Sequence, residues 1–159
     1  MKPINILTST IFIAFAACKT IPKEATAVKP FDQNRYLGKW YEIARFDYKF
    51  ERNLDNVTAT YTLNNDGTIK VTNRGYNYIE NAWKESIGKA KPVADPQEAK
   101  LKVSFFGPFY SGYNVIAIDN EYKYALVAGK NTSYLWLLSR EKTIPQNIRK
   151  DYLTKAQTI

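Results

Sequence analysis

The sequence predicts an all-β fold: an eight-stranded up-and-down antiparallel barrel with one C-terminal α-helix packed outside it. Eight short segments with strand composition follow one another between residues 38 and 139, turn signals separate them, and helical spacing appears after Arg140. Consecutive antiparallel strands lose their exposed edges by closing into a barrel, and a barrel of eight strands can hold one small ligand. A two-sheet sandwich is the alternative that the pattern leaves open.

Each expected strand is bounded by a break in the apolar pattern. Asn64-Asn-Asp-Gly67 is a hairpin signal, Gly107-Pro108 turns the chain, and Asp119-Asn-Glu121 turns it again. Leu101, Val103 and Phe105 alternate with polar residues, as expected of a half-buried strand. The expected strands are 38–45, 56–63, 68–76, 83–91, 99–105, 112–118, 122–128 and 134–139.

The segment from Pro145 to Ala156 has Ile148, Tyr152 and Leu153 at helical spacing. Thr143 is the expected N-cap, with Pro145 in the first turn. A helix against the outside of the barrel would explain why Leu135-Trp-Leu-Leu138 is apolar on both faces.

The N-terminal segment has the parts of a secretory signal. A lysine at position 2 precedes an apolar run that is too short to span a bilayer, and Ala16-Ala17 stands directly before Cys18. This looks like a bacterial lipobox, so residues 1–17 are expected to be a lipoprotein signal peptide and Cys18 the lipidated first residue. Residues 18–30 then form a flexible tether, and residues 31–159 the folded domain. An ordinary signal peptide, or a buried first strand with a free thiol, is the alternative.

The composition argues against catalysis and metal binding. The chain has no histidine and one cysteine, which removes histidine-based acid–base chemistry and the common zinc and iron sites. We therefore expect no enzyme activity, cofactor or metal. The formal charge of +8 is spread along the chain rather than gathered in a block, so no nucleic-acid partner is expected.

Strand parity predicts one closed end of the barrel. In an up-and-down barrel the even strands finish where the first strand starts, so Arg140 at the end of strand eight lies beside Trp40 on strand one. A guanidinium over an indole contributes about 0.5–2 kcal/mol. Gly38 allows a close approach. We expect Gly38, Trp40 and Arg140 to close this end and a ligand to enter at the other.

The ligand site is expected among side chains that alternation turns inward. These are Ala44, Tyr61 (or its neighbour Thr60), Leu101, Val103, Phe105, Tyr113, Val115, Trp136 and Leu138. The mouth is expected to be aromatic, with Phe46, Tyr48, Phe106, Phe109 and Tyr110 and with Arg45, Lys49, Arg52, Arg74 and Lys130 nearby. Such a rim suits an amphiphile with an anionic head, although solvated loop charges beside an aromatic membrane contact would give the same pattern.

Three motifs in this order resemble the lipocalin family, and within it the bacterial outer-membrane lipoproteins. The first is Arg35-Tyr-Leu-Gly-Lys-Trp40-Tyr-Glu-Ile-Ala-Arg45, the second Asp119-Asn-Glu-Tyr-Lys-Tyr124, and the third Arg140 in Leu138-Ser-Arg140. Asn120-Glu121 replaces the usual Thr-Asp of the second motif. Family members usually continue past the helix into a short strand that pairs with the first strand, whereas this sequence stops at the end of the helix. Two expectations stay open, a truncated chain or a first strand with an open edge.

The resemblance implies a lipid-anchored protein of the outer membrane that binds fatty acids such as palmitate, or lysophospholipids, in envelope lipid storage, transport or repair. A structural or interaction lipoprotein with a filled barrel is the alternative, and a homodimer stays open. An enzymatic interpretation would need Glu42 paired with a second inward acid, and no spacing in the sequence indicates one.

Overall fold

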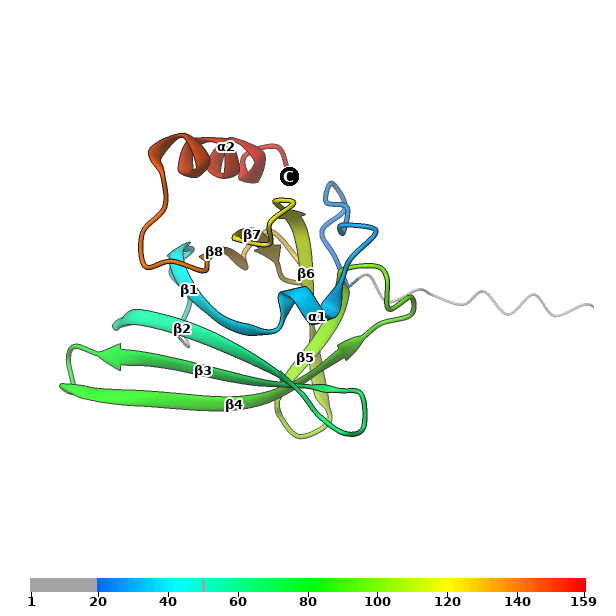
Figure 1. Cartoon of the computed structure of the whole chain (residues 1–159). Coiled ribbons are helices and arrows are strands. Elements are labelled where there is room, and N and C mark those ends of the chain that lie inside the picture. Colours follow the sequence, from blue (N-terminus) through cyan, green and yellow to red (C-terminus); the bar gives the residue numbers. More distant parts are fainter. Residues whose placement is uncertain (1–19, 50) are drawn as a thin grey trace, which may run out of the picture.

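The computed structural model describes residues 20–49 and 51–159, and within them the chain forms a closed antiparallel barrel. Strands β1 to β8 pair in sequence order, and β8 pairs with β1 to complete the ring. Helix α2, Gln146–Ala156, lies along the outside of the barrel (Figure 1). The predicted barrel with an outer helix is therefore confirmed, and the sandwich is excluded.

The strands lie close to the predicted ranges. They are β1 Gly38–Arg45, β2 Leu54–Leu63, β3 Ile69–Asn77, β4 Ala82–Pro92, β5 Lys100–Phe106, β6 Phe109–Ile118, β7 Tyr124–Ala128 and β8 Leu135–Ser139.

Side-chain carboxylates that accept backbone N–H groups explain two places where the elements differ from the prediction. β7 begins at Tyr124 rather than at residue 122, because the Asp119 carboxylate accepts the backbone N–H groups of Glu121, Lys123 and Tyr124 and holds these residues in a turn. A short helix, α1 Gln33–Tyr36, was not predicted, and Asp32 caps it through the N–H groups of Asn34 and Arg35.

The predicted N-cap of α2 is wrong. The cap position is Pro145, two residues after Thr143, and it makes no side-chain hydrogen bond to the helix.

The apolar residues gather on two sides of the barrel wall. Inside, Trp40, Tyr61, Leu101 and Leu138 belong to the main buried cluster. Outside, a second cluster of Ala117, Leu126, Ala128 and Leu135 lies under Tyr152 and Ala156 of α2. The Tyr152 hydroxyl donates to the Tyr124 carbonyl at 3.1 Å. The helix thus covers one outer face of β6 to β8, as the apolar sequence of β8 predicted.

Residues 20–30 lie against the barrel, which differs from the expectation of a flexible tether. Val28 N–H donates to the Val115 carbonyl at 2.9 Å, and the Val28 carbonyl accepts from Ala99 N–H at 2.9 Å. Ala25 and Ala27 are buried. The expected signal peptide and Cys18 lie outside the described residues.

The barrel wall is uneven around β4. β3 pairs along its whole length with Ala82–Ala90 of β4, and the two strands form a long ribbon that reaches beyond the barrel (Figure 1). By contrast, the ladder between β4 and β5 joins Lys89–Pro92 to Leu101–Ser104. Among the described residues, no helix is both long and apolar enough to cross a bilayer.

Candidate ligand-binding site

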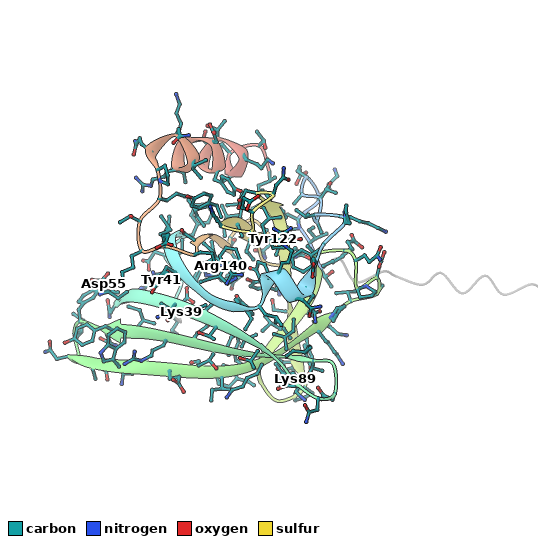
Figure 2. The ribbon with its side chains drawn as sticks, in the orientation of Figure 1. Lys39, Tyr41, Asp55, Lys89, Tyr122 and Arg140 are labelled. Carbon is teal, nitrogen blue, oxygen red and sulfur yellow. The ribbon has the colours of Figure 1, made fainter. Side chains whose placement is uncertain are left out.

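Arg140 closes one end of the barrel, as predicted. Its guanidinium carbon lies 3.9 Å from the centre of the Trp40 ring. Its nitrogens donate to four carbonyls, those of Arg35 (2.8 Å), Tyr36 (3.3 Å), Lys39 (2.9 Å) and Tyr122 (3.2 Å) (Figure 2). One cation therefore ties α1, β1 and the β6–β7 turn together.

Gly38 makes room for this arrangement. Its φ of +92° lies in the left-handed region, and a Cβ atom there would stand 3.3 Å from the Arg140 guanidinium. The Trp40 indole N–H donates to the Tyr36 carbonyl at 2.8 Å, which fixes the ring beneath the cation.

Three tyrosines form the next layer inside the barrel. The Tyr113 hydroxyl lies 2.6 Å from the hydroxyls of both Tyr36 and Tyr61. The Tyr36 ring packs on Trp40 at 4.9 Å between centroids. Burial raises the pKa of all three tyrosines, so their hydroxyls stay protonated and each can donate one hydrogen bond.

A charged cluster, made by Glu42, Arg45 and Glu51, fills the barrel between these tyrosines and the mouth. Arg45 is hydrogen-bonded to Glu42, and its Nε lies 3.7 Å from the Glu51 carboxylate. Arg45 also donates to the carbonyls of Glu51 (2.8 Å) and Leu54 (3.0 Å). The Trp136 indole N–H donates to Glu51 at 3.2 Å. The Glu42 and Glu51 side chains are 6% and 9% exposed.

Burial is the main cause of the unusual titration of these acids. Burial and, after it, the charge of Glu51 raise the pKa of Glu42 to about 7, against the opposing effect of Arg45. Burial also raises the pKa of Glu51. Because one guanidinium faces two carboxylates, protonation of one acid leaves the cluster electrically neutral.

The loop between β1 and β2 lies over the open end. Tyr48 is buried, and its ring lies 5.3 Å from the rings of Trp136 and Tyr134. Glu51 comes from the same loop. Both side chains therefore stand between the interior and the solvent.

The remaining predicted mouth residues, Phe46, Phe106, Phe109 and Tyr110, are exposed. Tyr78, Ile79 and Trp83 at the β3–β4 turn are also exposed, and the prediction missed them. Arg74 lies over Trp83, at 3.9 Å from its ring centre. The alternation of apolar residues ends at this turn, so no sequence pattern indicated the exposure of Tyr78, Ile79 and Trp83.

Most of the predicted pocket residues face the interior. Tyr61, Leu101, Val115 and Leu138 are buried in the main cluster, and Val103, Phe105, Tyr113 and Trp136 pack against it. The inward orientation predicted for Ala44 is wrong. A β-bulge between Glu42 and Ala44 shifts the register, so Ala44 pairs with Leu137 on the outer face and Arg45 pairs with the inward Trp136.

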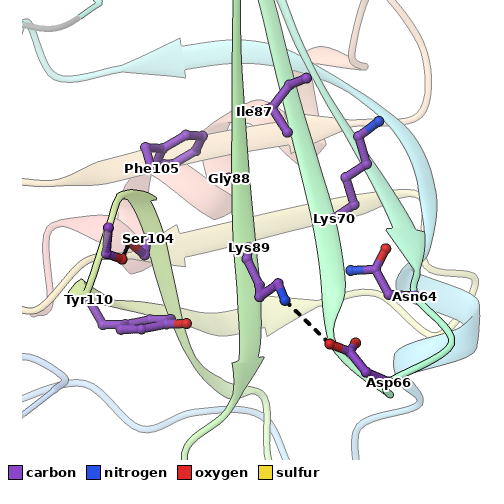
Figure 3. Close-up of a pocket in the computed structure, with 10 residues that line it drawn as sticks. Asn64, Asp66, Lys70, Ile87, Gly88, Lys89, Ser104, Phe105 and Tyr110 are labelled. Atoms are coloured by element: carbon purple, nitrogen blue, oxygen red, sulfur yellow. Dashed lines mark hydrogen bonds and ion pairs between the residues drawn. The ribbon is translucent and has the colours of Figure 1, made fainter.

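The interior is more polar than the sequence predicted. The cluster of two acids and an arginine stands where few polar groups were expected. Two pockets, of about 580 and 680 Å³, lie elsewhere, and neither is lined by Tyr61, Tyr113 or Trp136. The first lies on the barrel wall between Lys70, Lys89 and Tyr110 (Figure 3), and the second at the closed end.

Glu51 is the second inward acid that an enzymatic interpretation lacked. Arg45 engages both carboxylates, and the Trp136 indole N–H donates to Glu51. Within residues 20–49 and 51–159, no three His, Cys, Asp or Glu side chains are grouped so that they could hold a metal ion.

Comparison with known proteins places this barrel in a family. Residues 31–159 match the model of the lipocalin-like domain. The chain belongs to the lipocalin family. Its sequence is 53% identical to the outer membrane lipoprotein Blc of Citrobacter freundii over 150 residues, which cover 94% of this chain and 85% of the relative.

A more distant sequence relative and a solved structure also match this chain. Apolipoprotein D of Bos taurus is 35% identical over 135 residues, covering 78% of this chain and 70% of the relative. The structure of insecticyanin from the tobacco hornworm Manduca sexta superposes with a TM-score of 0.70 at 20% identity, covering 87% of this chain and 80% of that chain. The likeness to insecticyanin shows the fold alone.

Proposed function

We propose that this lipocalin is a membrane-anchored lipid-binding protein that holds or carries fatty acids or lysophospholipids in its barrel. The observation that carries the proposal is a lipocalin barrel closed at one end by Trp40 and Arg140, with Tyr48 and Glu51 of the β1–β2 loop buried at the other end. Relatives with about half of their residues identical are named outer membrane lipoproteins. We accordingly assign this protein to the outer membrane, anchored through acyl chains on Cys18, with a role in envelope lipid storage, transport or repair.

Entry of an acyl chain requires movement of the β1–β2 loop. Tyr48 and Glu51 stand in the mouth, and their withdrawal would open a path to Trp136 and the tyrosine layer. The loop contributes two buried side chains in this region, so its displacement costs far less than opening the wall, where every strand is paired with two neighbours.

The anionic head group belongs at the rim rather than in the interior. Arg45 is already engaged by Glu42, by Glu51 and by two carbonyls, and its Nε–H, which has no hydrogen-bond partner, faces Glu51 at 3.7 Å. A carboxylate placed beside Glu42 and Glu51 would also be repelled. Lys49 and Lys130 are exposed on the loops around the mouth. The methyl end of the chain therefore enters first, and the head group stays with these lysines.

Titration with a fluorescent fatty acid tests the proposal. Delipidated protein should bind about one molecule per chain, as expected for a barrel that encloses a single ligand. Trp136→Arg puts a cation into the proposed path and should weaken binding. Trp83→Arg makes the same change on the outer face of β4 and should not. Thermal unfolding of both variants separates lost binding from lost folding, and the absence of saturable binding at micromolar ligand would contradict the proposal.

A structural or interaction lipoprotein is the second candidate, and the packed interior favours it. If the tyrosines and the charged cluster fill the barrel permanently, native mass spectra of protein purified from membranes should show no bound lipid. Cross-linking in cells should then recover a protein partner.

A further inference from the structure

The β5–β6 hairpin carries an apolar tip that the barrel does not use. Phe106 is 81% exposed and Phe109 is 78% exposed, the two highest values among the exposed large hydrophobic residues of the described chain. Gly107, with a φ of +53°, and Pro108 turn the chain between them. The two phenylalanines are directly opposite each other in the β5–β6 ladder but bury little of their surface in the core, and so much exposed apolar area at one turn indicates an apolar partner.

Four lysines lie on the outer face of the strands beside this tip. Lys70 is directly opposite Lys89 in the β3–β4 ladder, and Lys91 is directly opposite Lys102 in the β4–β5 ladder. Directly opposed like charges destabilise an antiparallel pair. Asp66, at 3.3 Å from Lys89, partly offsets the first pair (Figure 3). We call these four residues the lysine face. Repulsion between the opposed lysines lowers the stability of the folded protein, and an anionic partner would relieve this repulsion.

Tyr110 joins the lysine face to the hairpin tip. The Nζ atoms of Lys91 and Lys102 lie 5.2 and 5.5 Å from the centre of its ring. Tyr110 follows Phe109 directly in the sequence. Successive strand residues point to opposite faces, so Tyr110 lies with the lysines while Phe109 points to the other face of the hairpin, and the apolar tip and the cations meet at the start of β6. This order of apolar, aromatic and basic groups matches the order of acyl chains, interface and anionic head groups in a bilayer leaflet.

The N-terminal segment arrives at the same side of the barrel. Thr20, the first described residue, accepts a hydrogen bond from the Asn114 side-chain amide at 2.8 Å, and its carbonyl lies where a Cβ atom on Gly112 would stand. Gly112 pairs with Lys102 and is three residues after Phe109, about 10 Å along the strand. Cys18 stands two positions before Thr20 in the sequence, which is at most about 7 Å of chain.

We propose that the β5–β6 hairpin tip and the lysine face form a membrane-docking surface that rests on a bilayer with anionic head groups. Phe106 and Phe109 enter the interface, and Lys91 and Lys102 contact the lipid phosphates. The proposal rests on the proposed function, because an anchor at Cys18 holds this side of the protein near the membrane. Docking fixes the orientation of the barrel, so that the mouth faces the leaflet from which an amphiphile is taken.

Quenching by brominated lipid tests this surface in the acylated full-length protein. The variant Phe109→Trp is reconstituted into vesicles of phosphatidylethanolamine and phosphatidylglycerol with brominated acyl chains. The tryptophan emission that Phe109→Trp adds to that of the wild-type protein should fall by about half, as expected for a side chain at the acyl boundary. Leu153→Trp on α2, on the other side of the barrel (Figure 1), is the matched control and should not be quenched.

The lysine face is tested separately. Lys91→Gln with Lys102→Gln should reduce the quenching of Phe109→Trp in vesicles that contain phosphatidylglycerol, and should have little effect in phosphatidylcholine. Fatty-acid titration of the lysine double variant should match wild type, so a failed docking experiment is distinguishable from a failed binding function.

Equal quenching of Phe109→Trp and Leu153→Trp, or none in either, would overturn the proposal. Quenching that does not depend on phosphatidylglycerol or on the two lysines would overturn its electrostatic half. If Phe106→Ser with Phe109→Ser instead converts a dimer into a monomer in detergent, a second copy of the chain occupies the surface and the proposal is wrong.

Discussion

Glu42→Gln should remove most of the pH dependence of stability that the charged cluster creates. Burial raises the pKa of Glu42 from 4.5 to about 7 in the folded protein. Between these two pH values the folded protein holds a proton that the unfolded chain releases. Raising the pH across this interval therefore lowers the free energy of unfolding. Each pH unit corresponds to about 1.36 kcal/mol, so the loss reaches at most about 3 kcal/mol by pH 7 and levels off above it.

Urea unfolding, followed by tryptophan fluorescence, measures this effect at roughly pH 4.5, 5.5, 6.5 and 7.5, a series that brackets the pKa of Glu42. Wild type should lose stability steadily over the series. Glu42→Gln keeps the shape and a hydrogen-bonding oxygen for Arg45 but carries no proton to release, so its curve should be flatter. Glu141→Gln, an exposed change after β8, is the control and should follow wild type. A wild-type curve that rises with pH, or a Glu42→Gln curve as steep as wild type, would refute the reasoning.

Three further substitutions test other parts of the account. Arg140→Met should lower the free energy of unfolding by about 3 kcal/mol in urea titrations, because four carbonyls lose their donor and Trp40 loses its cation. Tyr113→Phe removes a hydroxyl shared by two other tyrosines and should cost about 2 kcal/mol in the same assay. Gly112→Ala would place a Cβ 1.9 Å from the Thr20 carbonyl oxygen, so trypsin should cut faster within residues 20–30 while the barrel remains folded.

The opposite results would each remove one structural argument. An Arg140→Met protein as stable as wild type would mean that the closed end does not depend on this cation. No loss in Tyr113→Phe would mean that water replaces the shared hydroxyl. Unchanged cleavage of Gly112→Ala would show that the N-terminal segment is not held at β6.

The closed end could be predicted from the sequence because it depends only on the order and direction of strands. Trp40 begins the first strand and Arg140 follows the last, so closure of the ring brings them together whatever the detailed register. The family motifs lie at these same positions. The alternation of inward and outward side chains was also enough to predict that Leu101 and Leu138 face the interior, because both stand in regularly paired parts of their strands.

The charged cluster could not be predicted because it depends on a bulge and a loop. One extra residue after Glu42 turns Ala44 outward and Arg45 inward, and no residue type in this stretch marks the bulge. Tyr48 and Glu51 belong to a loop, where no periodicity shows which side chains are buried. The docked N-terminal segment did leave a signal, since Ala25 and Ala27 alternate with polar residues, but its small side chains resemble those of a linker.

Native mass spectrometry of the full-length protein purified from membranes tests the central claim most directly. The account predicts a species heavier than the acylated chain by the mass of one fatty acid or lysophospholipid. That species should disappear in Trp136→Arg and persist in Trp83→Arg. A spectrum that contains only the acylated chain, in wild type as in both variants, would contradict it.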